Sequence, residues 1–175
     1  FSSSNIINNN FTFNDKQLKF LRTISKKYSL ESINKIFEKA QKLKVLVIGE
    51  TIIDQYNFCE ALGKSGKEPY LALKDIFSEN YLGGAAAIAN HLADFTKRIK
   101  LITMIGEKEE YRKFITKKLN KKIETIFFKK NDSPTILKKR YIDNISKSKL
   151  FGIYSINDDV SPIKLDTEIC KCMEK

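Results

Sequence analysis

The run Val45–Gly49, with the sequence VLVIG, carries an apolar side chain at four consecutive positions before its glycine. A strand with one solvated face alternates apolar and polar residues, whereas a strand buried on both faces is apolar throughout. A second run, Leu101–Gly106, follows later in the chain and is apolar apart from Thr103. The two runs predict central strands of a parallel sheet and therefore an α/β fold.

A glycine pair and an alanine-rich segment lie between the two runs. Gly83 and Gly84 precede three consecutive alanines and open a predicted helix that continues to about Phe95. Strand, helix and strand in this order predict a right-handed crossover between parallel strands. Ahead of the helix we expect an irregular stretch up to residue 69, which contains glycines and a proline, and a peripheral strand over 70–74.

The second half of the chain alternates turn signals with short periodic segments. A helix is predicted over 109–119 and a strand over 123–128. After the turn cluster NDSP at 131–134, the segments 135–142 and 150–156 alternate in polarity and predict antiparallel strands.

Two amphipathic helices are predicted ahead of the first strand, with Asn14 or Asp15 capping one and Ser29 capping the other. We interpret residues 14–43 as a helical linker and residues 1–13 as a loop or the tail of a preceding domain. Because the chain begins with a phenylalanine and its last residues look helical without a stop signal, we expect it to be cut from a longer protein.

The formal charge of +11 does not by itself predict a nucleic-acid partner. The cations are spread from Lys16 to Lys175 among apolar residues, which favours a solvated surface over a basic patch. No apolar run approaches the roughly 18 residues that cross a bilayer, so no membrane partner is expected either. Three cysteines cannot pair completely and match no zinc spacing, which favours a reduced, cytoplasmic compartment.

Three residues are candidates for ligand contact. Asp54 follows the first strand, at the sheet edge where open α/β folds bind ligands, and a carboxylate there can accept hydrogen bonds from sugar hydroxyls. Gly83 and Gly84 allow a close backbone approach and free N–H groups at a helix start. Each feature also has a structural interpretation, as a turn cap for Asp54 and as a tight turn for the glycines.

The order and spacing of these segments resemble the opening of PfkB/ribokinase-family carbohydrate kinases. The first strand with Glu50, then Asp54, then the Gly83–Gly84 helix and a strand ending at Gly106, all match. Within the family the chain looks most like the kinase domain of ADP-heptose synthase, and the resemblance covers roughly residues 44–156. It implies an incomplete ribokinase-like three-layer α/β/α sandwich, with 44–175 as the N-terminal half of the kinase domain.

The resemblance also implies roles for the lid side of the domain. Segments of about 55–81 and 135–155 would form a small β-sheet lid over the sugar. The Pro134-Thr135 pattern with Lys138 and Arg140 matches the heptose kinases, and these two cations would meet a sugar phosphate. A solvated strand face remains the alternative interpretation of both.

Two positions depart from the family pattern. The asparagine expected at the third residue after Gly84 is Ala87, and Asn90 is the nearest candidate for its substrate contact. An acidic residue of the last lid strand is replaced by Tyr154. The identity of the sugar therefore stays open.

The family's Gly-Ala-Gly-Asp motif, with its catalytic base, does not occur in this sequence. We therefore expect no catalytic residue and no metal ligand in this chain, with ATP and Mg²⁺ bound mainly by a missing C-terminal half, and a fragment that is inactive alone. The parent is predicted to be a sugar or sugar-phosphate kinase that dimerises through the lid. A non-catalytic sugar-binding or scaffolding module is the alternative.

Residues 1–10 are similar to the closing segment of cytidylyltransferase-like domains. The similarity implies that the parent joins a nucleotidyltransferase to the kinase for nucleotide-sugar synthesis.

Overall fold

The computed structural model describes residues 13–64, 66, 68–159 and 163–173, and the chain divides after Lys42 into two compact units. The predicted tail over 1–13 and the nucleotidyltransferase similarity over 1–10 lie, apart from residue 13, outside the described residues.

The first unit contains the two expected helices, α2 (Asp15–Lys27) and α3 (Leu30–Gln41). Asn14 caps α2 by accepting a hydrogen bond from the backbone of Gln17, whose own side chain accepts from the Asn14 backbone. Ser29 caps α3 in the same manner, through the backbone N–H of Ser32. None of the described helices of the chain is long and apolar enough to cross a membrane.

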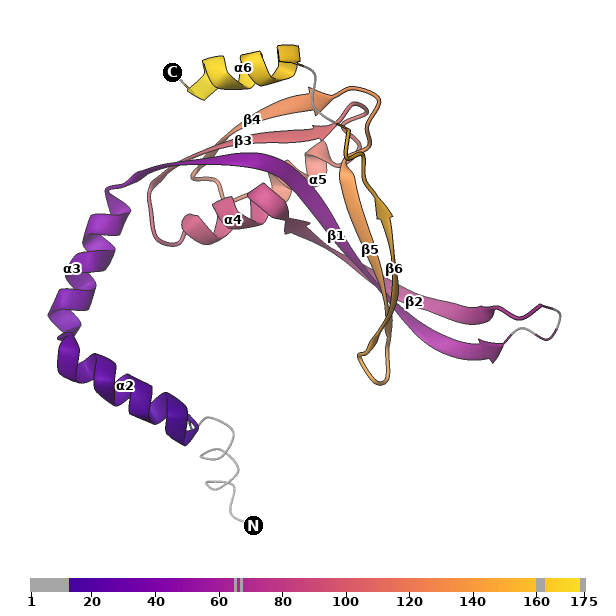
Figure 1. Ribbon diagram of the computed structural model, residues 1–175, viewed down its shortest axis with the longest axis horizontal. Helices are drawn as coiled ribbons and strands as arrows, with labels where there is room; N and C mark the ends of the chain where they lie inside the picture. Colours follow the sequence, from indigo (N-terminus) through magenta and orange to yellow (C-terminus); the bar gives the residue numbers. More distant parts are fainter. Residues whose placement is uncertain (1–12, 65, 67, 160–162, 174–175) are drawn as a thin grey trace. The chain divides into compact units, whose positions relative to one another are not determined.

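The second unit is an α/β structure built on one long strand, β1 (Lys44–Lys64), shown in purple in Figure 1. Five strands join it in a sheet of order β4-β3-β1-β5-β6, with β2 paired to β1 outside this path. The other elements are β2 (Leu71–Gly83), α4 (Gly84–Leu92), β3 (Arg98–Gly106), α5 (Arg112–Lys118), β4 (Ile123–Lys130), β5 (Ile136–Asp143), β6 (Lys149–Ser155) and α6 (Ile163–Met173).

The first third of β1 forms the main sheet with β3 and β4. All three strands are parallel, and β1 pairs with β3 from Lys44 opposite Arg98 to Glu50 opposite Met104. Helix α4 covers one face, where its alanines pack on Val47 and Leu101, and α5 buries Ile115 farther along. The α/β fold with a central parallel sheet, predicted from the two apolar runs, is confirmed.

The remainder of β1 forms the lid sheet, which we define as residues 52–64 of β1 with β2, β5 and β6. Here β1 pairs antiparallel with β2 and parallel with β5, and β6 pairs antiparallel with β5. The expectation of an irregular stretch up to residue 69 is wrong, because β1 continues to Lys64. Its polar residues have low strand propensity, but pairing on both edges from Ile52 to Cys59 satisfies the backbone and overrides that preference.

A chain of hydroxyl groups lies where β1 passes from the main sheet to the lid sheet. Thr103 of β3 donates to the backbone oxygen of Gly49 at 2.7 Å. Its oxygen also lies 2.7 Å from the hydroxyl of Thr51, which is therefore the donor between the two threonines. Both threonines are fully buried, so these bonds fix β1 to β3 at the junction.

Candidate functional site

Asp54 lies on the lid half of β1, with neighbours on both adjacent strands. In the strand register it lies opposite Tyr81 of β2 and Lys138 of β5. Tyr56, two residues farther along β1, lies opposite Arg140. Residues two apart in a strand share one face, so the register brings these five side chains to the same face of the lid sheet.

Asp54 and Arg140 form an ion pair across the two strands. The Nη1 group of Arg140 donates to the Oδ1 oxygen of Asp54, and both side chains are about one fifth exposed (21% and 23%). The guanidinium group also lies 5.4 Å from the centre of the Tyr56 ring. The hydrogen bond to Asp54 raises the pKa of Arg140 above its ordinary value, so the cation is permanent.

Gly83 and Gly84 bring the start of α4 against the same carboxylate. A Cβ atom at Gly83 would lie 2.5 Å from the Oδ2 oxygen of Asp54, so the carboxylate rests directly on this backbone. Gly84 has a φ of +57°, and a Cβ there would lie 2.4 Å from the backbone oxygen of Glu50. Gly84 needs glycine for the turn into the helix, whereas a side chain at Gly83 would displace the Asp54 carboxylate.

Aromatic side chains line the outer part of this face. The rings of Tyr56 and Tyr81 meet edge to face at 5.7 Å, and the Tyr81 hydroxyl donates to Glu79 at 2.5 Å. That hydrogen bond raises the pKa of Tyr81. These side chains and Asp54 line a surface hollow of about 500 Å³, together with Phe58, Leu82, Ile142 and Lys147. An acidic group beside aromatic walls is suited to a polyhydroxyl ligand.

Lys138 lies beside the ion pair but makes a different contact. Its ammonium group lies 5.7 Å from the ring centre of Tyr154, which is its register partner on β6. Because Lys138 and Arg140 are two residues apart, two cations follow one face of β5 next to Asp54. The structure brings five of the candidate residues into one neighbourhood, and their role in ligand binding stays a prediction: Asp54, Gly83, Gly84, Lys138 and Arg140.

Asn90 does not join this neighbourhood. Its amide nitrogen donates to the backbone oxygen of Lys118 at 3.0 Å, and its amide oxygen accepts from the backbone of Asn120 at 2.8 Å. Both ends of the side chain therefore hold the loop between α5 and β4. Both amide atoms of Asn90 are thus engaged within the protein, and its substrate contact stays a prediction.

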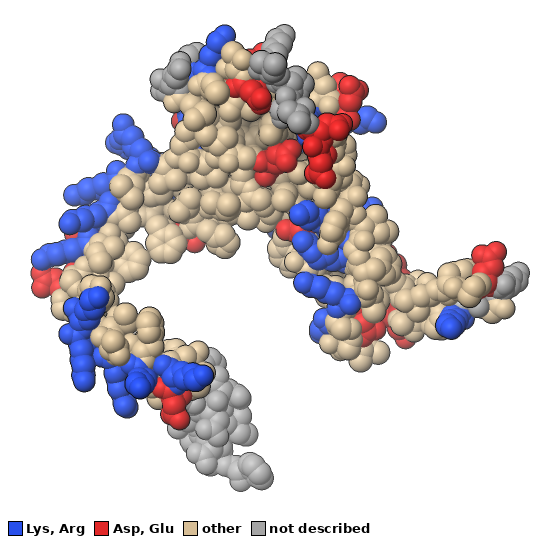
Figure 2. All heavy atoms as spheres, in the orientation of Figure 1, with Lys and Arg blue, Asp and Glu red and all other residues tan. Residues whose placement is uncertain are grey.

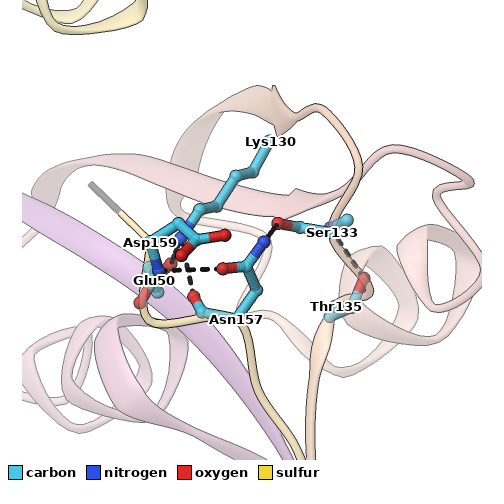
Figure 3. A network of polar contacts seen from close by, with 7 residues as sticks. Glu50, Lys130, Ser133, Thr135, Asn157 and Asp159 are labelled. Carbon is cyan, nitrogen blue, oxygen red and sulfur yellow. Dashed lines mark hydrogen bonds and ion pairs between the residues drawn. The ribbon is translucent and has the colours of Figure 1, made fainter. Parts of the chain in front are cut away.

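A polar network at the carboxyl ends of the main-sheet strands was not predicted (Figure 3). Lys130, at the end of β4, is 9% exposed and donates to the backbone oxygen of Asn157 at 2.7 Å, with Glu50 of β1 at 4.0 Å. The Asn157 amide donates in turn to Ser133 at 2.7 Å. The network ties the segment after β6 to the main sheet. The burial of Lys130 could not be recognised in the sequence, because Lys130 follows Lys129 and adjacent lysines are usually exposed.

A metal site in a protein needs several ligating side chains that lie close together. Among residues 13–64, 66, 68–159 and 163–173, no group of three or more His, Cys, Asp or Glu side chains is arranged to hold a metal ion. The ATP and Mg²⁺ expected from the family resemblance stay a prediction.

Curated relatives cover part of this chain. A D-beta-D-heptose 7-phosphate kinase of Bordetella bronchiseptica is 28% identical over 105 residues, which are 60% of this chain and 34% of that protein. The bifunctional protein HldE of Coxiella burnetii is 28% identical over 102 residues, or 58% of this chain and 22% of HldE. The HldE protein of Campylobacter jejuni subsp. doylei is 30% identical over 83 residues, or 47% and 18% of the two chains. No protein-family model matches the chain.

Solved structures show the same fold. A sugar-kinase candidate from Clostridium perfringens superposes with a TM-score of 0.55 at 16% identity, over 76% of this chain and 41% of that one. A phosphofructokinase candidate from Staphylococcus aureus gives a TM-score of 0.54 at 12% identity, over 75% and 39%. The chain spans about a third of the length of the heptose kinase and less than half of either structure. The chain is therefore similar in sequence to part of the heptose 7-phosphate kinases, and it has the ribokinase-like α/β fold of the solved sugar-kinase structures.

Proposed function

We propose that this chain supplies the sugar-binding side of an ATP-dependent sugar-phosphate kinase. The proposal rests on the ion pair between Asp54 and Arg140, which lies beside Lys138 and the Gly83 backbone on one face of the lid sheet. A carboxylate is suited to sugar hydroxyls, and paired cations are suited to a phosphate group. The similarity to heptose 7-phosphate kinases supports a phosphorylated heptose as the substrate class.

The ion pair between Asp54 and Arg140 affects how the phosphate and the hydroxyl groups of a substrate would bind. Arg140 donates to one carboxylate oxygen of Asp54 and so competes with a sugar hydroxyl for part of the acceptor capacity of that carboxylate. A substrate phosphate offers the guanidinium fork a better, bidentate acceptor and releases Asp54 for the hydroxyls. A sugar without phosphate must compete with the arginine instead.

Binding measurements with the full-length protein test this effect. Isothermal titration with heptose 7-phosphate and with unphosphorylated heptose is expected to show at least tenfold tighter binding of the phosphate ester, since one charge-assisted hydrogen bond contributes about 1.5–3 kcal/mol. Arg140→Gln should remove most of this preference. Lys139→Gln is the matched control, because Lys139 adjoins Arg140 on β5 but points to the opposite face. Equal affinity for the two sugars would reject the phosphate-binding role.

We propose that phosphoryl transfer takes place in a longer protein that contains this chain. Leu46 and Ile48 of β1 are 41% and 45% exposed on the face away from α4, and within the described residues this part of β1 pairs with β3 alone. We propose that further chain completes the sheet, binds ATP and Mg²⁺ and provides the catalytic base, so that residues 1–175 alone are inactive. A non-catalytic sugar-binding module is the competing function, and a phosphoryl-transfer assay of the full-length protein separates the two.

The similarity to HldE supports a further proposal about pathway and place. HldE is described as bifunctional, and we propose that the parent likewise joins a kinase to a nucleotidyltransferase in nucleotide-sugar synthesis in the cytoplasm. The order of the two activities along the parent chain would be read directly from its gene.

We propose that the full-length protein forms a homodimer through the lid sheet. Among the described strands, β6 pairs with β5 alone and β2 with β1 alone, so each leaves an edge that a second copy can cover. Sedimentation at micromolar concentration is expected to give a dimer. A strictly monomeric full-length protein would count against this assembly.

A further inference from the structure

Helix α2 separates its apolar and its cationic side chains onto two arcs. With 3.6 residues per turn, the apolar residues fall within about 160° of the helix circumference. The cations fall on the opposite arc and border the apolar one on both sides. The apolar set is Leu18, Phe20, Leu21 and Ile24, and the cationic set is Lys16, Lys19, Arg22, Lys26 and Lys27.

The apolar arc is open to solvent. Phe20 is 63% exposed, Leu21 41% and Leu18 37%, and no residue of α2 is buried. Phe13, just ahead of the cap, lines a shallow hollow on the same arc together with Phe20 and Leu21. Exposed aromatic and aliphatic groups gathered in this way are uncommon on a purely solvated surface.

The charge of α2 is strongly one-sided. Five cations and the single carboxylate of Asp15 give the helix a net charge of +4. In the described part of the chain, none of the five cations pairs with a carboxylate, and Lys27 lies over the ring of Tyr28 instead. Figure 2 shows blue side chains gathered along this helix.

Helix α3 provides an internal comparison. It is also amphipathic, but its two lysines are balanced by two glutamates, and Lys35 pairs with Glu31 at 2.7 Å. Its net charge is therefore zero. The two helices share an exposed apolar side, whereas the uncompensated positive charge belongs to α2 alone of the two.

We propose that α2 is a peripheral membrane helix that binds the surface of an anionic lipid bilayer. It would lie in the headgroup layer, with Phe20, Leu21 and Leu18 toward the acyl chains. The cations on both borders of the apolar arc would extend their stems over it and place their charges at lipid phosphates on either side. That two-sided arrangement favours a flat anionic surface over an acidic protein groove.

Helix geometry changes the expectation drawn from the sequence. Along the chain the cations are spread, which predicts a solvated surface and no basic patch. In the folded helix five of them collect on one side and complement a negative surface. The proposal concerns the first unit and is independent of the sugar-kinase function.

Vesicle co-sedimentation of the full chain tests the proposal. Binding is expected to vesicles that mix phosphatidylglycerol with phosphatidylcholine, and not to vesicles of phosphatidylcholine alone. Lys16→Gln with Lys19→Gln should weaken binding about 25-fold, since each cation near an anionic surface is worth about fivefold. Phe20→Gln with Leu21→Gln should weaken it more than about tenfold.

The matched control neutralises Lys35 and Lys39 of α3 to glutamine, which should leave vesicle binding within about twofold. Circular dichroism checks that each variant keeps its helices. Binding that is absent, or that persists in both α2 double variants, overturns the proposal. A wild-type oligomer that becomes monomeric in the Phe20→Gln, Leu21→Gln variant also overturns it, because a second copy would then cover the apolar arc.

Discussion

Asp54→Asn is expected to raise the KM for the sugar phosphate by about 30-fold or more in the full-length protein, after the release of Arg140 is allowed for. The amide keeps the shape of the side chain but loses the charge, and each hydrogen bond to an ionised group contributes about 1.5–3 kcal/mol. Two hydroxyls on one carboxylate give a loss of about 3 kcal/mol or more, and each 1.4 kcal/mol is a factor of ten. Steady-state kinetics with varied sugar phosphate measure the change.

Release of Arg140 opposes this loss, but it is the smaller effect. In Asp54→Asn the arginine no longer competes with the sugar, which favours substrate binding. The pair is about one fifth exposed, and exposed or partly exposed pairs are worth at most about 1 kcal/mol. The lost hydroxyl contacts therefore outweigh the freed cation, and the predicted KM still rises.

Asp75→Asn is the matched control for this variant. Asp75 is an exposed carboxylate on β2, in the same lid sheet but outside the hollow around Asp54. Its substitution should leave KM within about twofold, and nucleotide affinity without sugar should be unchanged in both variants. A folded Asp54→Asn protein with a normal KM would assign Asp54 a structural role and remove the main support for the sugar site.

Gly106→Ala is expected to destabilise the second unit by about 3 kcal/mol or more. A Cβ atom there would lie 2.1 Å from the backbone nitrogen of Thr135 and 2.4 Å from the carbonyl carbon of Pro134. Both are backbone atoms, which cannot rotate away as a side chain can, so the added methyl group must displace the segment that leads into β5. The same shift breaks the 2.9 Å hydrogen bond from the Gly106 N–H to the Thr135 hydroxyl.

Urea unfolding of the purified chain measures the change in the free energy of unfolding. Gly66→Ala is the matched control, because a Cβ at Gly66 meets nothing within 4 Å. It should change the stability by less than about 0.5 kcal/mol. If Gly106→Ala and Gly66→Ala unfold at the same urea concentration, the close contact at Gly106 does not constrain the fold.

The main sheet was predictable because its strands carry a strong local signal. Residues Val45–Gly49 and Leu101–Gly106 are, apart from Thr103, apolar on both faces, which in a chain of this length points to a parallel sheet. The family resemblance implied a β-sheet lid here, but the residue pattern missed the lid half of β1, because its polar residues lower strand propensity and its pairing partners lie far away in sequence. Tertiary pairing decided the conformation there.

The candidate site was predictable where a motif fixed the spacing along one strand. Lys138 and Arg140 are two residues apart, so their common face followed from strand periodicity. The contacts of Asn90 with the loop between α5 and β4 could not be predicted, because the helix start alone does not say which turn of α4 faces that loop. The burial of Lys130 could not be predicted, because it depends on Asn157, a residue that returns to the main sheet after two more strands.

Because β1 runs without a break through both sheets, the lid sheet is connected to the main sheet by a continuous strand. A lid carried on two loops could swing freely over its ligand, but this one is joined to the main sheet by an unbroken strand whose root is fixed by the Thr51 and Thr103 hydroxyls. Any movement of the lid sheet relative to the main sheet must therefore bend or twist β1 near Thr51. Slow amide hydrogen exchange is expected at Thr51, and it should become faster in Thr103→Val. This result would show that the two hydroxyl groups restrain β1 at the junction of the two sheets.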